Sequence, residues 1–138
     1  MTEATTAAIL ALARVYTHLY NCPVPDKMLI WIGASFEDLR DFPSEARRAA
    51  GYELRRIQRG LMPTDWKPLP SVGSGVNEIR IHTRVEHRVM YVAKFEEAIY
   101  VLHAFEKKSR QTRDTDLDLA RERLKQAETL RREERKSK

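Results

Sequence analysis

Residues 68–108 read PLPSVGSGVNEIRIHTRVEHRVMYVAKFEEAIYVLHAFEKK, and this stretch decides the fold. Three runs rich in β-branched and aromatic residues lie at 75–83, 85–95 and 98–105, and short polar links join them. This pattern predicts an antiparallel, three-stranded meander. Arginines stand inside the first two runs, where apolar strands seldom carry them, and they indicate an anionic partner such as a phosphate backbone.

Strand alternation sorts these side chains onto two faces. Ile79 and Ile81 are expected to face the helices, whereas Glu78, Arg80 and His82 point the other way. In the next strand Arg88 alternates with Val89, so the two arginines are expected to share a face that helices leave open. The rim of this basic face is expected to carry Lys67, Glu106, Lys107 and Lys108.

The remaining elements predict an α+β protein with a mostly antiparallel, four-stranded sheet. The MLIWIG run that begins at Met28 has the pattern of a short buried strand, and a brief helix follows it. Apolar residues recur at helical spacing through 44–61 and predict one stripe, made of Ala46, Ala50, Leu54, Ile57 and Leu61. These two helices are expected on one face of the sheet. A last helix is expected from about residue 114, with acidic residues at its start and basic residues at its end, as the helix macrodipole favours.

Three regions follow from this organisation. Residues 1–27 are expected to form an added N-terminal helix and a proline-containing linker, and Met28 is a second candidate start codon. Residues 28–127 are expected to form the folded domain. Residues 128–138 are expected to be a charged C-terminal tail.

Composition narrows the class of protein. The chain has 138 residues, enough for one compact domain, and a net charge of +5, which favours nucleic acid or another acidic partner. Its single cysteine, Cys22, excludes a disulfide framework, and the four histidines show no metal-ligand spacing. No run approaches the roughly 20 apolar residues of a membrane span. We therefore expect a cytoplasmic protein with no membrane partner, metal or small-molecule cofactor.

A shallow basic face with a carboxylate suits one reaction in particular. RNA is cut without a metal when its 2′-hydroxyl attacks the adjacent phosphate, provided that one group removes that proton and another protonates the leaving oxygen. Arginine stabilises the crowded phosphorane because its planar fork holds two oxygens and stays charged. The residues alone do not separate this reaction from plain nucleic-acid binding.

Five strings of the sequence resemble a known family. They are DFPSEARRAAG (41–51), DWKPLPSVGSGVNEIRI (65–81), EHRVMYV (86–92), AIYVLHAFEKKSR (98–110) and DLDLARERLK (116–125). Together with the order of elements, they resemble the RelE/ParE toxin superfamily, in particular its phage-related, HigB-like branch. The resemblance covers residues 28–127 and leaves out residues 1–27.

The resemblance implies a RelE-like fold and a toxin of a type II toxin–antitoxin pair. Many members are ribosome-dependent endoribonucleases that cut mRNA, so it also implies the ribosome, mRNA and a helix-turn-helix antitoxin (HigA-like) as partners. Arg88 matches the arginine held near the scissile phosphate, and Arg80 matches a second phosphate contact. Lys67 falls where members place a glutamate or a lysine as base. Glu106 or Lys107 falls near the position of a C-terminal acid.

The general acid is not assigned by the resemblance, because this chain lacks the histidine–tyrosine ending that some members have. Substitutes for acid–base work include Lys107, Lys108, His103 and Tyr91, with Glu78 as a further acid–base candidate. His103 and Tyr91 also have the pattern of core residues in apolar strands. Glu78 also suits a structural role, as an ion-pair partner that orients Arg80 or Arg88. Further RNA contacts are expected from Lys108, Arg55, Arg59 and Trp66, and the two helical arginines also suit a solvated face.

Two other functions fit the same fold. A ParE-like toxin inhibits DNA gyrase by binding it, and needs no catalytic site. A non-catalytic domain would bind nucleic acid and cut nothing. The retained arginines and the Lys107–Lys108 pair favour the nuclease over the gyrase inhibitor.

Overall fold

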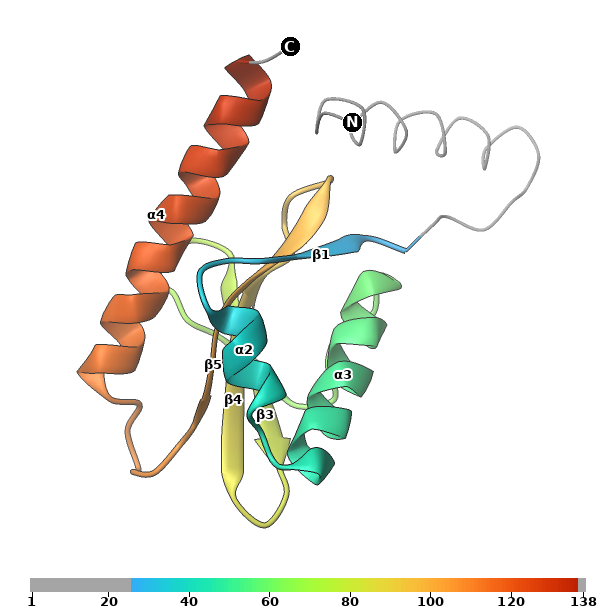
Figure 1. Ribbon diagram of the computed structural model, residues 1–138, viewed down its shortest axis with the longest axis vertical. Helices are drawn as coiled ribbons and strands as arrows, with labels where there is room; N and C mark the ends of the chain where they lie inside the picture. The colour runs from blue at the N-terminus through green and yellow to red at the C-terminus, as the bar shows by residue number, and fades with distance from the viewer. Residues whose placement is uncertain (1–25, 137–138) are drawn as a thin grey trace, which may run out of the picture.

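The computed structural model describes residues 26–136 and confirms the α+β class (Figure 1). The predicted N-terminal helix lies outside the described residues. The elements follow one another as β1 (Met28–Trp31), α2 (Ser35–Arg40), α3 (Ser44–Gln58), β2 (Trp66–Pro68), β3 (Val76–His82), β4 (Glu86–Val92), β5 (Ala98–Glu106) and α4 (Asp114–Lys136). The last helix runs through Lys136, so most of the expected charged tail continues α4.

The strands form a single sheet in the order β1-β5-β4-β3-β2. Strand β1 pairs in parallel with β5, and the other three pairings are antiparallel. The meander is therefore present as predicted. It occupies the middle of the sheet, and β5 is buried along Ala98–Phe105 because it has a strand on either side and helices over both faces.

The sheet has five strands where four were expected, and the additional strand is β2. Strand β2 has only three residues, and its middle residue, Lys67, is paired with Glu78 of β3. Pro68 lacks a backbone donor, and it is tolerated here because β2 lies at the edge of the sheet. The proline that concealed the strand in the sequence is thus a normal edge residue.

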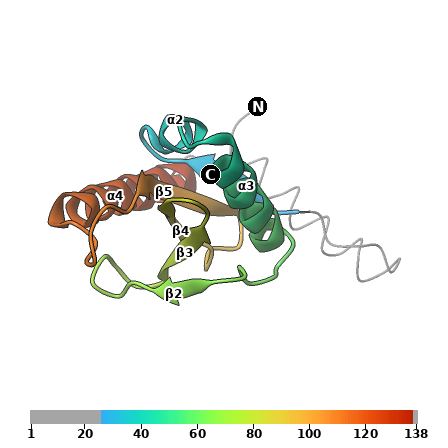
Figure 2. The ribbon, with the colours of Figure 1, turned by 90° about the horizontal axis from the view of Figure 1, so that it is seen from below.

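Helices cover both faces of the sheet. The apolar stripe of α3 packs on one face through Ala46, Ala50, Leu54 and Ile57, as predicted. The helix ends at Gln58, so Leu61, the last residue of the predicted stripe, lies beyond it and is 50% exposed. Gly60 follows the helix with a φ of 84°, a left-handed conformation that ends it. On the other face α4 packs over β5 through Ala120, Leu124 and Ala127. Figures 1 and 2 show α3 and α4 on opposite sides of the sheet.

The expectation of a helix-free second face was therefore wrong. Because α4 is amphipathic and packs a buried stripe against β5, that face is open only toward β2, β3 and the start of β4. This uncovered region is where the charged strand residues lie.

Candidate functional site

The β3–β4 ladder brings the two strand arginines together. Arg80 and Arg88 are directly paired, and Lys67 on β2 is directly paired with Glu78 on β3. Because directly paired residues share a face, all four side chains project from the α4 side of the sheet. The alternation predicted from the sequence is thus confirmed, since Ile79 and Val89 pack in the core beneath α3.

Glu78 is the centre of this group, although its side chain is only 1% exposed. Its Oε1 lies 3.6 Å from Nε of Arg88 and 3.9 Å from Nε of Arg80. Burial raises the pKa of Glu78 above its ordinary value of 4.5, and the charges of Lys67, Arg88, Arg80 and Lys107 act in the opposite direction. We call these five residues the Glu78 cluster. The pKa of Glu78 is raised overall, so the effect of burial outweighs that of the four neighbouring cations.

Three polar atoms in the cluster are buried without a hydrogen-bond partner among the described residues. They are Oε2 of Glu78, Nε of Arg80 and Nε of Arg88. Nearly all buried polar groups in proteins have a partner, so such atoms require an explanation. Unsatisfied donors beside a carboxylate leave capacity for hydrogen bonds to an anionic ligand.

The two arginines differ in how firmly they are held. Arg88 is 5% exposed, its Nη1 donates to the backbone oxygen of His87 at 3.0 Å, and its Nη2 lies 3.6 Å from Glu86. The side chain of Arg80 is 35% exposed and its outer end reaches solvent. Arg88 is thus a fixed cation at the base of the site, whereas Arg80 can adjust to a ligand.

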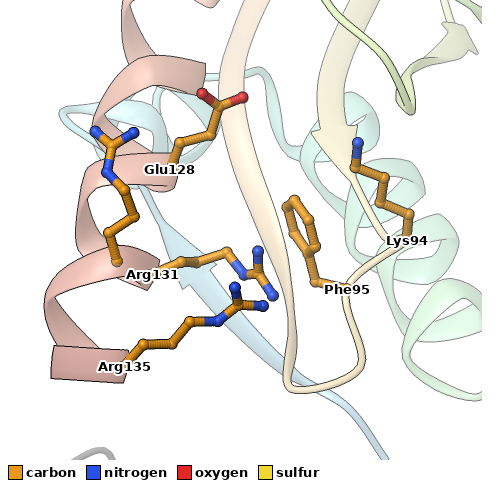
Figure 3. A pocket seen from close by; sticks show the side chains of 6 residues that line it. Lys94, Phe95, Glu128, Arg131 and Arg135 are labelled. Atoms are coloured by element: carbon orange, nitrogen blue, oxygen red, sulfur yellow. The ribbon is translucent and has the colours of Figure 1, made fainter. Parts of the chain in front are cut away.

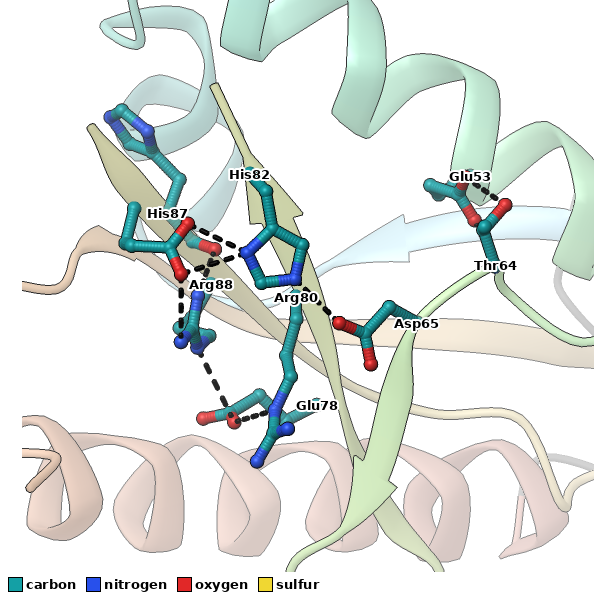
Figure 4. Close-up of polar contacts among 9 residues, drawn as sticks. Glu53, Thr64, Asp65, Glu78, Arg80, His82, His87 and Arg88 are labelled. Carbon is teal, nitrogen blue, oxygen red and sulfur yellow. Dashed lines mark hydrogen bonds and ion pairs between the residues drawn. The ribbon is translucent and has the colours of Figure 1, made fainter. Parts of the chain in front are cut away.

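His82 lies at the rim of the site between two carboxylates (Figure 4). Its Nε2 is 2.5 Å from Asp65, and its Nδ1 is 2.8 Å from Oε1 of Glu86. Hydrogen bonds to Asp65 and then Glu86 raise the pKa of His82 above its ordinary value of 6.5. The same Oε1 of Glu86 contacts Arg88, so contacts continue from His82 through Glu86 and Arg88 to Glu78.

The segment before β2 is positioned by α3. The Glu53 carboxylate is buried and accepts from the backbone N–H of Thr64 at 2.6 Å and from its hydroxyl at 2.7 Å. The backbone oxygen of the next residue, Asp65, accepts from the backbone N–H of Arg80 at 2.9 Å. These bonds fix the Asp65 carboxylate beside His82.

The structure brings together five of the residues that the sequence indicated, namely Lys67, Glu78, Arg80, Arg88 and Lys107. Lys107 acts on Glu78 through its charge, and its backbone N–H donates to the backbone oxygen of Glu86 at 2.8 Å. His82, Asp65 and Glu86 were missed as site residues. The alternation placed His82 on the correct face, but its partner Asp65 is 17 residues away in the sequence, so their contact could not be predicted.

Other predicted residues lie away from the cluster. Glu106 is paired with His87, whose ring contacts Phe42 on the α3 side, so Glu106 projects to the opposite face and pairs with Lys108 at 3.7 Å. Trp66 is paired with Ile79 and shares that opposite face. The helical arginines also lie there, because α3 covers that face; they are Arg55, which pairs with Asp26, and Arg59 at the end of the helix.

Tyr91 and His103 are buried in different surroundings. Tyr91 packs in the core beneath α3, where burial raises the pKa of its hydroxyl to about 12. His103 contacts Asp116 of α4 at 2.8 Å and lies 3.8 Å from Asp38 of α2. Its ring stacks on Phe105 with 4.9 Å between centroids. These contacts join α2, β5 and α4, so they give His103 a role in holding the fold together.

Two negative findings concern the described residues alone. Within 26–136, no three histidine, cysteine or acidic side chains are grouped so that they could hold a metal ion. None of the helices in this range is both long enough and apolar enough to cross a bilayer.

The geometry supplies what phosphate chemistry requires of side chains. Two forked cations and two lysines provide charge for an anionic centre. Burial raises the pKa of the Glu78 carboxyl, and hydrogen bonds to Asp65 and Glu86 raise the pKa of the His82 imidazole. Two groups of the kinds that accept and donate protons therefore lie on one surface with the cations.

Comparison with curated proteins gives no significant match to this sequence. A family model, described as phage derived protein Gp49-like (DUF891), matches residues 37–125, which contain every residue of the Glu78 cluster. The matched range also contains α3, the complete meander and the first half of α4. The chain therefore belongs to the phage-derived Gp49-like (DUF891) family, within the RelE/HigB-like toxin fold group.

Proposed function

We propose that this protein is the toxin of a type II toxin–antitoxin system and cleaves mRNA on the ribosome without a metal. Membership of the Gp49-like family supports the toxin assignment, since this family shares its fold group with RelE and HigB. The observation that carries the proposal is the buried Glu78 carboxylate beneath the paired Arg80 and Arg88. The carboxylate adds a proton acceptor to the two cations, which the reaction requires and binding alone does not.

Each group has a role in the proposed reaction. Arg88 and Arg80 hold the oxygens of the scissile phosphate and stabilise the phosphorane. Glu78 is covered by Arg80 in this structure; it removes the proton of the attacking 2′-hydroxyl once Arg80 turns outward to the phosphate, while Lys67 and Lys107 add positive charge around the phosphate. His82 protonates the 5′-oxygen that leaves. After the step, the 2′-oxygen has formed a bond to phosphorus, the bond to the 5′-oxygen is broken, and the proton has moved from the 2′-oxygen to the base.

The arrangement of acid and base supports these roles. Glu78 and His82 are four residues apart on β3 and project from the same face, with Arg80 between them. The Arg80 side chain runs from beside His82 toward Glu78, so an RNA strand that followed it would pass both the imidazole and the carboxylate (Figure 4). Ionised Glu78 accepts a proton and protonated His82 donates one, which is the division of labour that the reaction needs.

The partner that we propose is a helix-turn-helix antitoxin, HigA-like, whose binding covers the cationic surface. An inhibitor of this site needs negative charge to meet Arg80, Lys67 and Lys107. Neutralising these side chains would block phosphate entry, because the ligand and the inhibitor compete for the same donors.

The test is induced expression of the full chain in a bacterial host, followed by mapping of mRNA 5′ ends. Wild type is compared with Arg88→Ala and with Arg48→Ala, which removes an exposed arginine from α3. Growth arrest with new, codon-phased 5′ ends is expected for wild type and Arg48→Ala, and neither effect is expected for Arg88→Ala. Arrest without new ends in all three proteins would reject the nuclease and indicate a ParE-like gyrase inhibitor.

A non-catalytic domain of the same fold gives a different result. It would cause no cleavage in any of the three proteins, while purified wild type would still bind RNA more tightly than Arg88→Ala. RNA binding with intact RNA and unaffected growth would therefore replace the enzyme assignment with a binding function.

A further inference from the structure

A second cationic site lies at the opposite end of the sheet from the hairpin that carries His82. The pocket has a volume of about 310 Å³ and is lined by Lys94, Phe95, Glu128, Arg131, Arg132 and Arg135. We call it the Phe95 pocket. Lys94 and Phe95 come from the β4–β5 turn, and the other four residues come from the second half of α4 (Figure 3).

Two cations in the pocket, Arg131 and Lys94, contact the aromatic ring of Phe95. The guanidinium carbon of Arg131 is 3.6 Å from the centroid of Phe95, and Nζ of Lys94 is 5.2 Å from it. Nε of Arg131 also donates to Glu97 at 2.5 Å, which fixes the orientation of the guanidinium plane. Arg131 is therefore pre-organised, with an outer face directed away from the ring.

The β4–β5 turn that carries Lys94 and Phe95 is itself held in place. Nζ of Lys27 donates to the backbone oxygens of Ala93 and Phe95, at 2.8 and 2.6 Å. Gly75 has a φ of 81°, and a Cβ there would come within 2.6 Å of Cδ of Lys94. The stem of Lys94 thus lies in the space that the missing side chain leaves.

The charge of the pocket is unbalanced. Four of its six lining residues are cations and one, Glu128, is a carboxylate. Among residues 26–136, no ion pair joins Lys94 or Arg135 to a carboxylate, whereas the charge of Arg131 is matched by Glu97 beside the pocket. Basic residues near a helix C-terminus complement the helix dipole, which accounts for Arg135. It does not account for Lys94, which reaches the same hollow from a different element.

We propose that the Phe95 pocket binds a phosphodiester of RNA, separately from the Glu78 cluster. The pocket offers charge to a phosphate and the outer face of a fixed guanidinium plane to a base, and arginine planes stack on RNA bases. The choice of RNA rests on the proposed function, but binding at this pocket requires no cleavage.

The two sites contact separate parts of an RNA surface. From Arg88 to Lys94 the strand covers about 20 Å at the usual rise of a β-strand. The sheet surface between them is closed, because Leu69, Val72 and Leu124 cover Val76, Met90 and Val92. An RNA that contacts both sites must therefore pass around the edge of the domain. A large folded RNA, such as that of a ribosomal subunit, can do so.

The test uses the purified full chain and a short 2′-O-methyl RNA oligonucleotide, which cannot undergo 2′-hydroxyl attack. Affinity is measured as a function of salt for wild type, for Lys94→Gln with Arg135→Gln, and for a control with Arg48→Gln and Lys125→Gln. The control loses the same charge from exposed positions outside the pocket. Each lost phosphate contact lowers the slope of log affinity against log salt by about 0.7 for single strands.

We expect the pocket variant to lose affinity and slope, and the control to keep most of both. Glu128→Gln, which removes the carboxylate of the pocket, should bind more tightly than wild type. Equal losses in the pocket variant and the control would overturn the proposal, because they would indicate general electrostatics. Thermal unfolding of each variant shows whether the fold is kept. The outcome is independent of the nuclease, because the oligonucleotide remains uncut in every case.

Two further probes separate other anions from RNA. In an NMR titration, the signals of residues 94–97 and 131–135 are followed as each ligand is added. If pyrophosphate shifts these signals to saturation and the oligonucleotide leaves them unchanged, the pocket binds a free phosphate ligand. Polyglutamate that behaves in the same way would assign it to an acidic protein segment. Either result would overturn the RNA assignment.

Discussion

Arg80 and Arg88 are directly opposite each other in the β3–β4 ladder, and their Nε atoms lie 3.9 and 3.6 Å from the same oxygen of Glu78. Like charges in directly paired positions destabilise a sheet, and burial of an arginine adds a desolvation penalty. The buried carboxylate offsets part of this unfavourable arrangement. A protein that needed only a stable sheet would be more stable with apolar residues at these positions, so we attribute the arrangement to function.

Replacing Arg88 with lysine tests whether the fork or only the charge is needed. Arg88→Lys keeps one positive charge but loses the planar pair of donors that holds two phosphate oxygens. We expect RNA cleavage to fall by about 10²–10³-fold, the usual effect of removing a donor that stabilises the transition state. The rate at which new 5′ ends appear on purified ribosomes measures this.

The control for that experiment is Arg48→Lys, the same exchange at an exposed position of α3. Both variants are unfolded in urea beside the wild type, because Arg88 is buried and its replacement can lower stability. Unchanged cleavage by a folded Arg88→Lys protein would show that Arg88 supplies charge alone.

Glu78→Gln should change stability with pH in one direction. The folded state raises the pKa of Glu78, so the protonated carboxyl is the form that folding favours. Its contribution to stability is fully present below 4.5, the ordinary value, and is lost as pH rises through the higher pKa of the folded state. Glutamine does not ionise, so the free energy of unfolding of Glu78→Gln, relative to wild type, should increase from below 4.5 toward neutral pH.

Urea unfolding at a series of pH values measures that difference, with Glu122→Gln on the exposed side of α4 as control. A relative stability that stays level or declines with rising pH would mean that the neighbouring cations outweigh burial. The same Glu78→Gln protein should have lost RNA cleavage at every pH if Glu78 is the base. A variant that gains stability and loses activity would support the view that the carboxylate is kept for chemistry.

Much of this site could be predicted from the period of two in β3 and β4. Alternation alone places Glu78, Arg80 and Arg88 on one face, since neither strand is interrupted there. It fails in β5, where a bulge between the pairings of Met90 and Tyr91 shifts the register by one residue. Counting in steps of two from Ala98 therefore assigns the residues after the bulge to the wrong face of the sheet. For this reason the sequence did not predict that Glu106 and Lys107 lie on opposite faces.

Contacts between distant elements were not predictable from a single sequence. Strand β2 has three residues beside a proline, too few for a periodic signal, yet it carries Lys67 into the cluster and fixes Asp65 beside His82. The packing of α4 on the sheet also depends on tertiary contacts, because its apolar positions are few. These are properties of the assembled sheet and not of any one segment.

Two glycines should respond to alanine in opposite directions. At Gly73, a Cβ would come within 2.2 Å of Cδ2 of Leu124, whose side chain is buried in the core beneath α4. Overpacking of this kind lowers stability by about 1–3 kcal/mol. At Gly51, inside α3, a Cβ meets nothing within 4 Å, and alanine should raise stability by about 0.5–1 kcal/mol. Urea unfolding of both variants measures the difference, and a Gly73→Ala protein as stable as Gly51→Ala would contradict the packing of α4 on this loop.

His82 should set the upper pH limit of cleavage if it is the general acid. Two carboxylates raise its pKa, and the hydrogen bond to Asp65 is the larger cause. An acid must be protonated, so activity should decline as pH rises through this raised value, which lies above 6.5. His82→Gln should lower cleavage by about 10²–10⁴-fold, the usual contribution of an acid–base group, and abolish that decline.

Asp65→Asn separates this role from a structural one, because the imidazole stays in place while its main carboxylate partner loses its charge. The pKa of His82, followed by NMR of the ring protons, should be lower in Asp65→Asn, and the decline in cleavage should move to lower pH by the same amount. The two shifts must agree in size, since both report one proton on one ring. If the NMR titration moves but the pH profile of cleavage does not, the acid is another group, and Lys107, whose charge also reaches Glu78, is the next to test.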